Sequence, residues 1–330
     1  MVKPILPRIH SFEFHDLKSF PNFLKYQITF ILYIYWSFEL PQIITDYFPM
    51  LKHLVRSRYQ VVSQALSDAI VALALKFPND RVSVMDMCSG GSGPNDLISK
   101  QVNHLILDMC SGGSGPNTLI STHVNTLMEV RGSPNIQFYL TDLYPNLETW
   151  KRVCSTNPYL NYIGTPVDIT QPFTNLPKFD KIFQTFYCCF HHFDDTEIRK
   201  ILKNSLSNSD GFAILETTSR TPFNVLKVSI INTLFTLFII PFYITKIPLT
   251  MLITLYIIPI LLLTFLWDNV ISSLRTRSSE EILDIINELN LKYEEGDDFK
   301  WEFVVGGGYS TYPTDRVNWL IGLKKPIDSY

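Results

Sequence analysis

The chain has 330 residues, of which 46% are hydrophobic and 18% are charged, and its formal net charge is −3. This length fits one large domain with additions, or two domains. The absence of a basic excess argues against a nucleic-acid partner. The five cysteines show no paired spacings, which favours reduced thiols inside a cell.

The first 80 residues are expected to form an N-terminal helical segment. The apolar run Ile28–Phe38 has only 11 residues. This is too short to span a bilayer and favours a core or interfacial helix. Apolar residues recur at helical spacing through Arg58–Lys76, and Pro78 should end this second helix.

Short apolar runs then alternate with helical patterns. Two capping boxes, Asp194 with Glu197 and Ser278 with Glu281, open amphipathic helices. The alternation predicts an α/β fold with a doubly wound, mostly parallel, Rossmann-like sheet that is closed by an antiparallel pair. The expected strands are Val82–Met87, His104–Met109, Ile136–Leu140, Lys181–Phe186, Gly211–Leu215, Trp301–Val305 and Val317–Leu323.

A long apolar segment interrupts this pattern. Val228–Thr245 gives 18 residues without a charge, and Ile247–Trp267 gives 21 more after Lys246. Both lengths match a helix that crosses about 30 Å of hydrocarbon. The segment therefore predicts an apolar helical hairpin in a membrane, and the alternative is a buried core hairpin in a soluble protein.

Basic residues stand at both outer ends of this hairpin, which favours a cytosolic location for the ends and the catalytic core. They are Arg220, Lys227, Arg275 and Arg277. The expected organisation is a helical segment at 1–80, a Rossmann-like core at 81–223, the hairpin at 224–268 and the remainder of the core at 269–330.

A glycine-rich segment occurs twice in the sequence, as "MDMCSGGSGPNDLIS" and "LDMCSGGSGPNTLIS". Aligning Val84–Leu105 with Ile106–Leu127 gives 16 identities in 22 positions. Two units are too few for a solenoid, which needs about three or more. We interpret the repeat as a local duplication in which one copy of a site is redundant.

The repeated segment has the composition of a ligand-binding loop. An apolar run ends in an acid, and a turn of small residues follows, which a ligand can approach closely. The dinucleotide fingerprint fails because Thr118 stands where its third glycine belongs. The phosphate loop fails because no lysine follows the glycines.

The sequence resembles the class I, Rossmann-like S-adenosylmethionine-dependent methyltransferases. The motifs that carry this resemblance are "ILDMCSGGSGP", "FYLTDLYPN", "GTPVDIT" and "FDKIFQTFYCCFHHF", in that order. It is more closely similar to an uncharacterised branch with "DLCSG", "TDLYPN", "FHHF" and a hydrophobic hairpin followed by "WD…SxLRxxSxEE". Phe12–Leu24 also looks like that branch, whereas the duplication and Ile28–Pro49 depart from it.

The resemblance implies S-adenosyl-L-methionine as the cofactor. It implies a strand-end acid at Asp108, ribose binding by Asp142 and adenine binding by Asp168. The full set of residues that it assigns to the cofactor is Asp108, Cys110, Gly112, Gly113, Gly115, Asp142, Leu143, Val167 and Asp168. A helix cap and a turn residue are the alternative interpretations of Asp142 and Asp168.

The choice between the two copies depends on the length of the connection. Only 34 residues separate Asp108 from Asp142, whereas 56 separate Asp86 from it, and strand–helix–strand connections are compact. We therefore expect the second copy to bind the cofactor and the first to be a surface insertion, the mark of a recent duplication or a faulty gene model. If the first copy forms the strand instead, Asp86, Gly90 and Gly91 take these roles.

His191 and His192 are candidates for a general base, and a packed histidine at a strand end is the alternative. Cys188 and Cys189 beside them lack the spacing of a structural zinc site, so no metal is expected. The predicted activity is methyl transfer at a membrane to a lipid or another hydrophobic acceptor. Two alternatives remain: a membrane-anchored protein without turnover, and a soluble small-molecule methyltransferase whose hairpin covers its own pocket.

Overall fold

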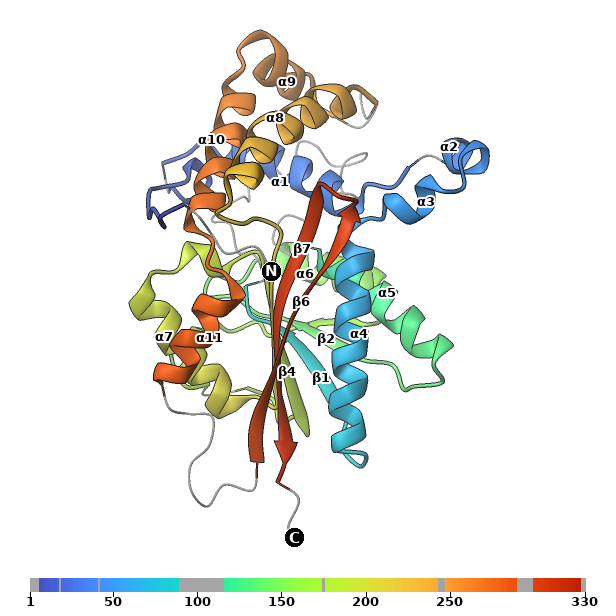
Figure 1. Ribbon diagram of the computed structural model, residues 1–330, viewed down its shortest axis with the longest axis vertical. Helices are drawn as coiled ribbons and strands as arrows, with labels where there is room; N and C mark the ends of the chain where they lie inside the picture. Colours follow the sequence, from blue (N-terminus) through green and yellow to red (C-terminus); the bar gives the residue numbers. More distant parts are fainter. Residues whose placement is uncertain are drawn as a thin grey trace.

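A seven-stranded sheet forms the centre of the protein, as the computed structural model in Figure 1 shows. The structure describes residues 6–17, 19–40, 42–88, 116–173, 176–242, 247–289 and 299–327, apart from the side chains of residues 43 and 52. The strand order is β3-β2-β1-β4-β5-β7-β6. The strands are β1 (Val82–Asp86), β2 (Gln137–Leu140), β3 (Leu160–Tyr162), β4 (Lys181–Tyr187), β5 (Gly211–Glu216), β6 (Phe299–Thr311) and β7 (Asp315–Pro326).

The strand directions confirm the expected doubly wound sheet. β1 pairs in parallel with both β2 and β4, and β4 pairs in parallel with β5. β7 runs antiparallel to β5 and β6. All six residues of β5 are buried, as expected for a strand covered on both faces. The chain order reverses between β1 and β4, and this switch point is where such sheets bind ligands.

Helices cover the two faces of the sheet (Figure 1). α4 (Arg58–Lys76), α5 (Asn117–Val130) and α6 (Leu147–Thr156) contribute to one apolar core. α7 (Asp195–Asn208) and α11 (Ser279–Glu288) contribute to the other. Both expected capping boxes are present, at the N-termini of α7 and α11.

β1 corrects the interpretation of the first repeat copy as a surface insertion. Val84, Met85 and Asp86 belong to that copy and are almost completely buried in the middle of the sheet. α5, in contrast, begins at Asn117, in the second copy. The compact 34-residue connection requires the strand and the helix to come from one copy. In the structure, the strand β1 belongs to the first copy and the helix α5 begins in the second copy.

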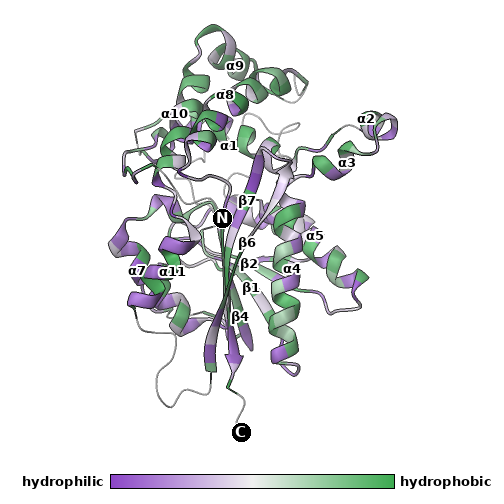
Figure 2. Cartoon of the chain, in the orientation of Figure 1, coloured by the Kyte–Doolittle hydropathy of each residue, from purple (hydrophilic) through white to green (hydrophobic). Residues whose placement is uncertain are grey.

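A third apolar core lies beyond the carboxyl ends of the strands, in a helical cap. Hydrophobic residues dominate this cap, as Figure 2 shows. It combines α1 (Asn22–Ser37), α8 (Pro222–Ile239), α9 (Leu249–Leu252), the π-helical turn η4 (Ile253–Ile257) and α10 (Ile260–Arg275). Other short helices of the described residues are η1 (Phe14–Asp16), α2 (Gln42–Tyr47), α3 (Leu51–Leu54) and η2 (Phe190–His192).

The second apolar run is not the single straight helix that its length predicts. The chain bends by 73° between η4 and α10, at Ile258 and Pro259. Proline lacks a backbone N–H and its ring clashes with the preceding turn, so it breaks a helix at this point. Within the described residues, one helix (Pro222–Phe242) could cross a membrane by length and composition, and the bent pair could form a second span.

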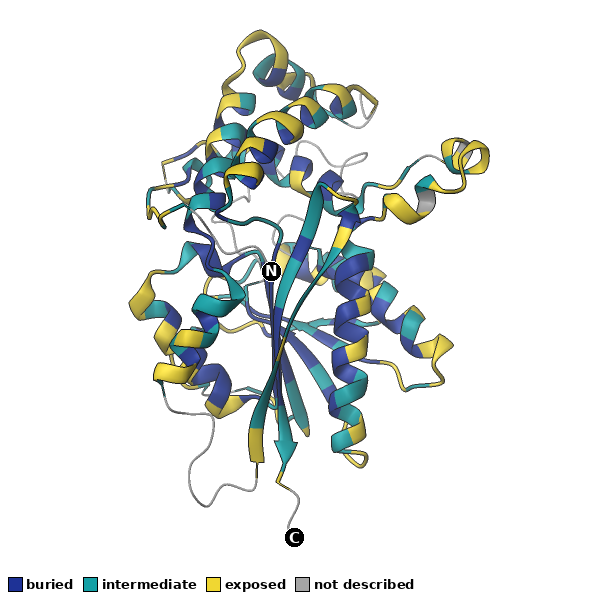
Figure 3. Cartoon of the chain, in the orientation of Figure 1, coloured by how far each residue is buried: buried dark blue, intermediate teal, exposed yellow. Residues whose placement is uncertain are grey.

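The side chains of α8 are arranged opposite to those of an ordinary surface helix. Its buried residues are Asn224, Lys227, Val228, Asn232 and Thr236, four of which are polar. Its outer face, which Figure 3 shows as largely exposed, carries bulky apolar side chains. These exposed residues are Phe223, Leu226, Ile230, Ile231, Leu234 and Phe238, between 46% and 69% exposed.

Candidate active site

Hydrogen bonds join the carboxyl ends of β1 and β2. The backbone carbonyl of Asp86 accepts bonds from the amide (3.1 Å) and the hydroxyl (2.6 Å) of Thr141. The carbonyl of the next residue, Asp142, accepts a bond from the Val167 amide at 2.9 Å. Asp86, Asp142 and Asp168 are therefore brought to one edge of the sheet, beside its switch point.

Asp86 occupies the strand-end position for which the sequence also considered Asp108. Its Oδ2 accepts a hydrogen bond from the side-chain amide of Asn117 at 2.7 Å, which ties β1 to the start of α5. The other loop residues assigned to the cofactor lie outside the described residues. They are Asp108, Cys110, Gly112, Gly113 and Gly115, together with Gly90 and Gly91 of the first copy.

Asp142 and Asp168 each stabilise a local turn. Oδ1 of Asp142 accepts the amide of Tyr144 at 2.8 Å. Oδ1 of Asp168 accepts the amide and the hydroxyl of Thr170 at 2.9 and 2.7 Å. The turn interpretation therefore has direct contacts in the structure. These turns also fix two partly exposed carboxylates on one rim, and carboxylates accept hydrogen bonds from the hydroxyl and amino groups of a nucleoside.

Two further residues assigned to the cofactor differ in exposure. Leu143, beside Asp142, is 44% exposed, whereas Val167, beside Asp168, is buried at 7%. An exposed leucine between two strand ends offers an apolar surface for a flat aromatic base. The carboxylates and this apolar surface together fit a nucleoside-bearing cofactor.

A cavity of about 240 Å³ lies above β4 and β5. Its floor is formed by Tyr187 at the end of β4, by Cys188 directly after it and by Thr217 after β5, and Pro116 lines it next to α5. Residues of α1, α8 and α10 complete its walls. The cavity therefore separates the strand ends from the helical cap, where an acceptor would meet the cofactor side of the sheet.

A larger cavity, of about 580 Å³, lies elsewhere, against β5, β6 and β7 and beside the start of α11. Among the described residues, none from β1, β2 or β4 lines it. It is therefore away from the switch point of the sheet, and we assign the candidate active site to the smaller cavity.

Cys188 has an unusual backbone in this smaller cavity. Its φ angle is 49°, in the left-handed region that residues other than glycine rarely adopt. Such strain costs about 1–3 kcal/mol and collects at functional sites. Burial raises the pKa of the Cys188 thiol to about 12, so the sulfur is protonated at neutral pH and is a poor nucleophile.

His191 lies in a buried ion-pair network next to the cavity rather than in its wall. Nδ1 of His191 is 3.0 Å from Oε2 of Glu216. Burial alone would lower the pKa of His191, but the Glu216 carboxylate outweighs burial and raises it. Because Glu216 occupies Nδ1 of His191 in a buried ion pair outside the cavity wall, the structure supports the packed-histidine alternative.

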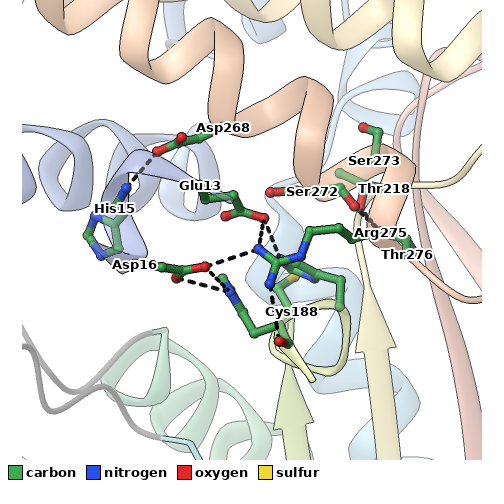
Figure 4. A network of polar contacts seen from close by, with 12 residues as sticks. Glu13, His15, Asp16, Cys188, Thr218, Asp268, Ser272, Ser273, Arg275 and Thr276 are labelled. Carbon is green, nitrogen blue, oxygen red and sulfur yellow. Dashed lines mark hydrogen bonds and ion pairs between the residues drawn. The ribbon is translucent and has the colours of Figure 1, made fainter. Parts of the chain in front are cut away.

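Figure 4 shows how this network extends to the N-terminal segment and α10. Nη1 of Arg275 is 3.0 Å from both Oε1 of Glu13 and Oδ2 of Asp16. Its Nη2 donates to the carbonyl oxygen of His192 at 3.1 Å. The network thus clamps the end of α10 and the N-terminal segment onto the loop after β4.

Ligand atoms of Glu13, His191 and His192 lie within 4.8 Å of one another, the distance range of a metal site. Nδ1 of His192 is also 3.2 Å from Oδ1 of Asp16. The guanidinium of Arg275 already supplies a cation to Glu13. This charge would repel a metal ion, so the cluster is better explained as part of the ion-pair network.

Sequence reasoning missed a second charged cluster, which stands in the cavity wall. Asp315, at the start of β7, accepts from Nε of Arg58 at 2.8 Å and from Nζ of Lys227 at 2.9 Å. Arg58 begins α4 and Lys227 belongs to α8, so the cluster joins three elements that are far apart in the sequence. The basic residue at 227 was noticed as a flank of the hairpin, but nothing in the sequence indicated its partners.

All four basic residues that flank the hairpin are in ion pairs within the protein. Arg220 pairs with Glu281, and Arg277 is 2.6 Å from Asp195. Lys227 and Arg275 pair with the carboxylates described above. These four positive charges are therefore paired with carboxylates of the same chain. The cytosolic orientation predicted from them stays a prediction.

No protein-family model matches the sequence, and no curated protein matches it. Solved structures with a similar fold include the plantazolicin methyltransferase BpumL in complex with SAH. It has a TM-score of 0.42 and 10% identity over 91% of this chain and 96% of that chain.

Two further similar structures have comparable values. An O-methyltransferase family protein from Burkholderia thailandensis has a TM-score of 0.36 and 11% identity over 82% of this chain and 58% of that one. The methyltransferase domain of bacterial CtHen1-CN has a TM-score of 0.37 and 11% identity, with coverages of 79% and 98%. Likeness at this level does not assign a family.

Proposed function

We propose that this protein is an S-adenosylmethionine-dependent methyltransferase that acts at a membrane on an amphiphilic acceptor. The observation that carries the proposal is the hydrogen-bonded series from Asp86 through Thr141 to Asp142 and Val167. It brings three acids to the switch point of a doubly wound sheet, and a glycine-rich sequence directly follows the first of them.

Each of these residues has a separate part in cofactor binding. Asp142 would accept hydrogen bonds from the ribose hydroxyls of the cofactor, and Asp168 would accept one from its adenine amino group. Asp86 orients the start of α5 through Asn117, and the free amides at such a helix start favour a negatively charged group. The bound cofactor supplies a methyl group that is already activated on a sulfonium.

The chain then has to align the acceptor and exclude water. The cavity above β4 and β5 provides the space, and its aromatic walls from α1 and α10 exclude water from the reacting atoms. The protonated Cys188 thiol and the ion-paired His191 do not supply a strong base. The favoured acceptor atom is therefore one that needs little help in losing its proton.

The inverted side-chain pattern of α8 supports membrane association. A helix that faces water exposes its polar side, whereas α8 buries its polar side and exposes large apolar residues. Polar residues of membrane helices face the protein interior in this way. The outer face of α8 is therefore suited to the hydrocarbon of a lipid bilayer.

A soluble small-molecule methyltransferase is the second candidate. It is favoured by one observation: Lys227, Val228 and Asn232 of α8, and Phe265 and Asn269 of α10, all line the cavity. The hairpin thus covers the pocket whether or not it also enters a bilayer. Partition of the chain between membrane and supernatant separates the two candidates.

Calorimetric titration with S-adenosylhomocysteine tests the cofactor site. Asp142→Ala removes a charged acceptor, which should cost about 1.5–3 kcal/mol and weaken binding roughly 10- to 150-fold. Asp180→Ala is the matched control, because Asp180 precedes β4 and so lies at the opposite edge of the sheet. Equal affinity of the parent and Asp142→Ala would refute the ribose contact, and no binding to the parent would refute the proposed function.

A further inference from the structure

The cavity above β4 and β5 is walled by more positive than negative charge. Arg58 and Lys227 both line it, and no other charged residue among those described does so. The two cations share one carboxylate, Asp315, which lies behind them. Two positive charges and one negative charge leave the cluster with an excess of one positive charge.

The cluster of Arg58, Lys227 and Asp315 is buried, so its excess positive charge is poorly solvated and has a cost in free energy. The Lys227 side chain is 4% exposed and that of Arg58 is 12% exposed. Burial opposes the ionisation of Asp315, but Arg58 and Lys227 outweigh it and hold the pKa of that carboxyl well below its usual range. Asp315 is therefore fully ionised at neutral pH, and one unbalanced positive charge remains in a poorly solvated place.

Arg58 retains hydrogen-bonding capacity toward the cavity. Its Nε is used by Asp315, and its guanidinium stacks 4.8 Å from the ring centre of Tyr35. Within the part of the chain that the structure describes, its two Nη atoms have no hydrogen-bond acceptor. Two parallel N–H groups of this kind match the geometry of a carboxylate or phosphate.

The remainder of the wall is mixed: Thr29, Thr217, Thr218, Asn232 and Asn269 are polar, and the other residues offer apolar surface. Tyr35, Trp36, Tyr187 and Phe265 present aromatic surfaces, and Leu32 adds an aliphatic one. A volume of about 240 Å³ is smaller than the roughly 300–1,000 Å³ of pockets for drug-sized ligands. The cavity therefore has room for the head of an amphiphile rather than for all of it.

We infer that the acceptor carries an anionic group, a carboxylate or a phosphate, which binds between Arg58 and Lys227 at the head of an apolar chain. This inference rests on the proposed function, because it takes the cavity to be the acceptor site. A free fatty acid and an anionic lipid headgroup share this chemistry. The methionine carboxylate of the cofactor is the competing occupant.

Short amphiphiles test the inference in the full-length protein held in a neutral detergent. The probes are hexanoate and hexyl phosphate, with hexanol as the neutral match, and binding is measured by calorimetry with S-adenosylhomocysteine present. We expect at least one anion to bind about 10-fold or more tightly than hexanol, as charge-assisted hydrogen bonds require. Tighter binding of hexanoate favours a fatty acid, and tighter binding of hexyl phosphate favours a lipid headgroup.

Two variants change the charge of the cluster in opposite directions. Lys227→Gln leaves one cation and one carboxylate, and should abolish the preference for anions. Asp315→Asn leaves two cations and should keep or increase the preference. A merely structural role would weaken binding in both variants, so parallel losses would overturn the inference.

The cofactor supplies the remaining control. If Arg58→Gln and Lys227→Gln weaken the affinity for S-adenosylhomocysteine itself by 10-fold or more, the cations hold the cofactor and the inference is wrong. If the parent binds S-adenosylhomocysteine but does not distinguish hexanoate or hexyl phosphate from hexanol, the inference fails and the proposed function survives. If the parent does not bind S-adenosylhomocysteine at all, the proposed function fails.

Discussion

α7 and α8 have similar lengths, but they are built for different surroundings. α7 buries Ile198, Ile201 and Leu202 against the sheet and exposes polar residues, as a helix in water does. α8 buries Asn224, Lys227 and Asn232 and exposes phenylalanine, leucine and isoleucine. The surface of α7 is thus suited to water, whereas the outer face of α8 is suited to an apolar solvent.

The difference between the surroundings of α7 and α8 suggests where the protein binds its cofactor and where it binds its acceptor. The acids that we propose to bind the cofactor lie at the carboxyl edge of the sheet. The cavity that we propose for the acceptor lies where the sheet meets the cap, and residues from both parts line it. An amphiphile could therefore place its head against the strand ends while its apolar chain follows the cap toward the bilayer.

Charging the outer face of α8 should have the largest effect. Ile230→Arg with Leu234→Arg puts two charges on its exposed apolar face, at about 2.5–3.5 kcal/mol each for a position in the bilayer. The variant should move from the membrane pellet to the supernatant in alkaline carbonate. The control, Leu75→Arg with Val130→Arg, charges two exposed apolar residues of α4 and α5 and should leave partition unchanged. A parent chain that is soluble without detergent would contradict the proposed membrane association.

Truncating an apolar side chain should have the next largest effect, and the loss in the free energy of unfolding should be larger on α7 than on α8. Ile201→Ala on α7 removes a fully buried side chain and should lower the free energy of unfolding by about 2–5 kcal/mol. Leu234→Ala on α8, where the side chain is 46% exposed, should change stability in detergent by about 0.5 kcal/mol or less. Denaturant unfolding measures both, and similar losses would mean that the outer face of α8 packs against protein.

The ion-pair network at the junction should make stability depend on pH. Folding raises the pKa of His191 above its ordinary value, because the Glu216 carboxylate outweighs burial. The folded chain therefore binds this proton more tightly than the unfolded chain. Its contribution is complete below the unfolded pKa, near 6.5, and is lost as pH rises through the higher folded-state pKa.

His191→Gln should lack this part of the pH dependence, so its stability deficit relative to the parent should narrow as pH rises. His53→Gln on α3 is the control, because His53 is exposed and the variant should retain the parental profile. Urea unfolding between pH 5.5 and 8.5 measures the effect. A deficit that stays constant over this range would show that His191 acts only by packing.

Removing one copy of the repeat should have the smallest effect. β1 comes from the first copy and α5 from the second, so deleting Asp96–Asn117 leaves a single "MDMCSGGSGPNTLIS". Pro94 and Asn95 then replace Pro116 and Asn117 with the same residue types. Deleting Val84–Leu105 gives the alternative junction "RVSILDMCSGG". Both variants should fold and bind S-adenosylhomocysteine as well as the parent does. A loss in both would mean that the duplication itself is needed.

Local patterns predicted much of the core. α4 has the bounds that its apolar periodicity predicts, and both capping boxes form, because these signals depend on residues three or four apart. The three-residue strand β3 was missed, since so short a run carries no recognisable pattern. The bend at Pro259 was missed because continuous hydrophobicity suggests one helix, whatever the backbone does.

The contacts that form the site were beyond the reach of sequence patterns. Arg275 meets Glu13 across 262 residues, and Arg58 meets Asp315 across 257. The resemblance had marked the segments around Glu13 and Arg275 separately, without indicating that they bind each other. Pairings of this range depend on the complete tertiary fold, which places the N-terminal segment, α4 and β7 around the ends of β4 and β5.

Methyl transfer from labelled S-adenosylmethionine tests the central claim most directly. The full-length protein would be incubated with the labelled cofactor and with vesicles of lipids extracted from its host membranes, and the lipids would then be extracted into organic solvent. We predict label in the organic phase with the parent and at least about 10-fold less with Asp142→Ala, the lower limit expected for a lost charged hydrogen bond. Cofactor binding without any transfer of label to lipid would contradict a membrane methyltransferase acting on an amphiphile.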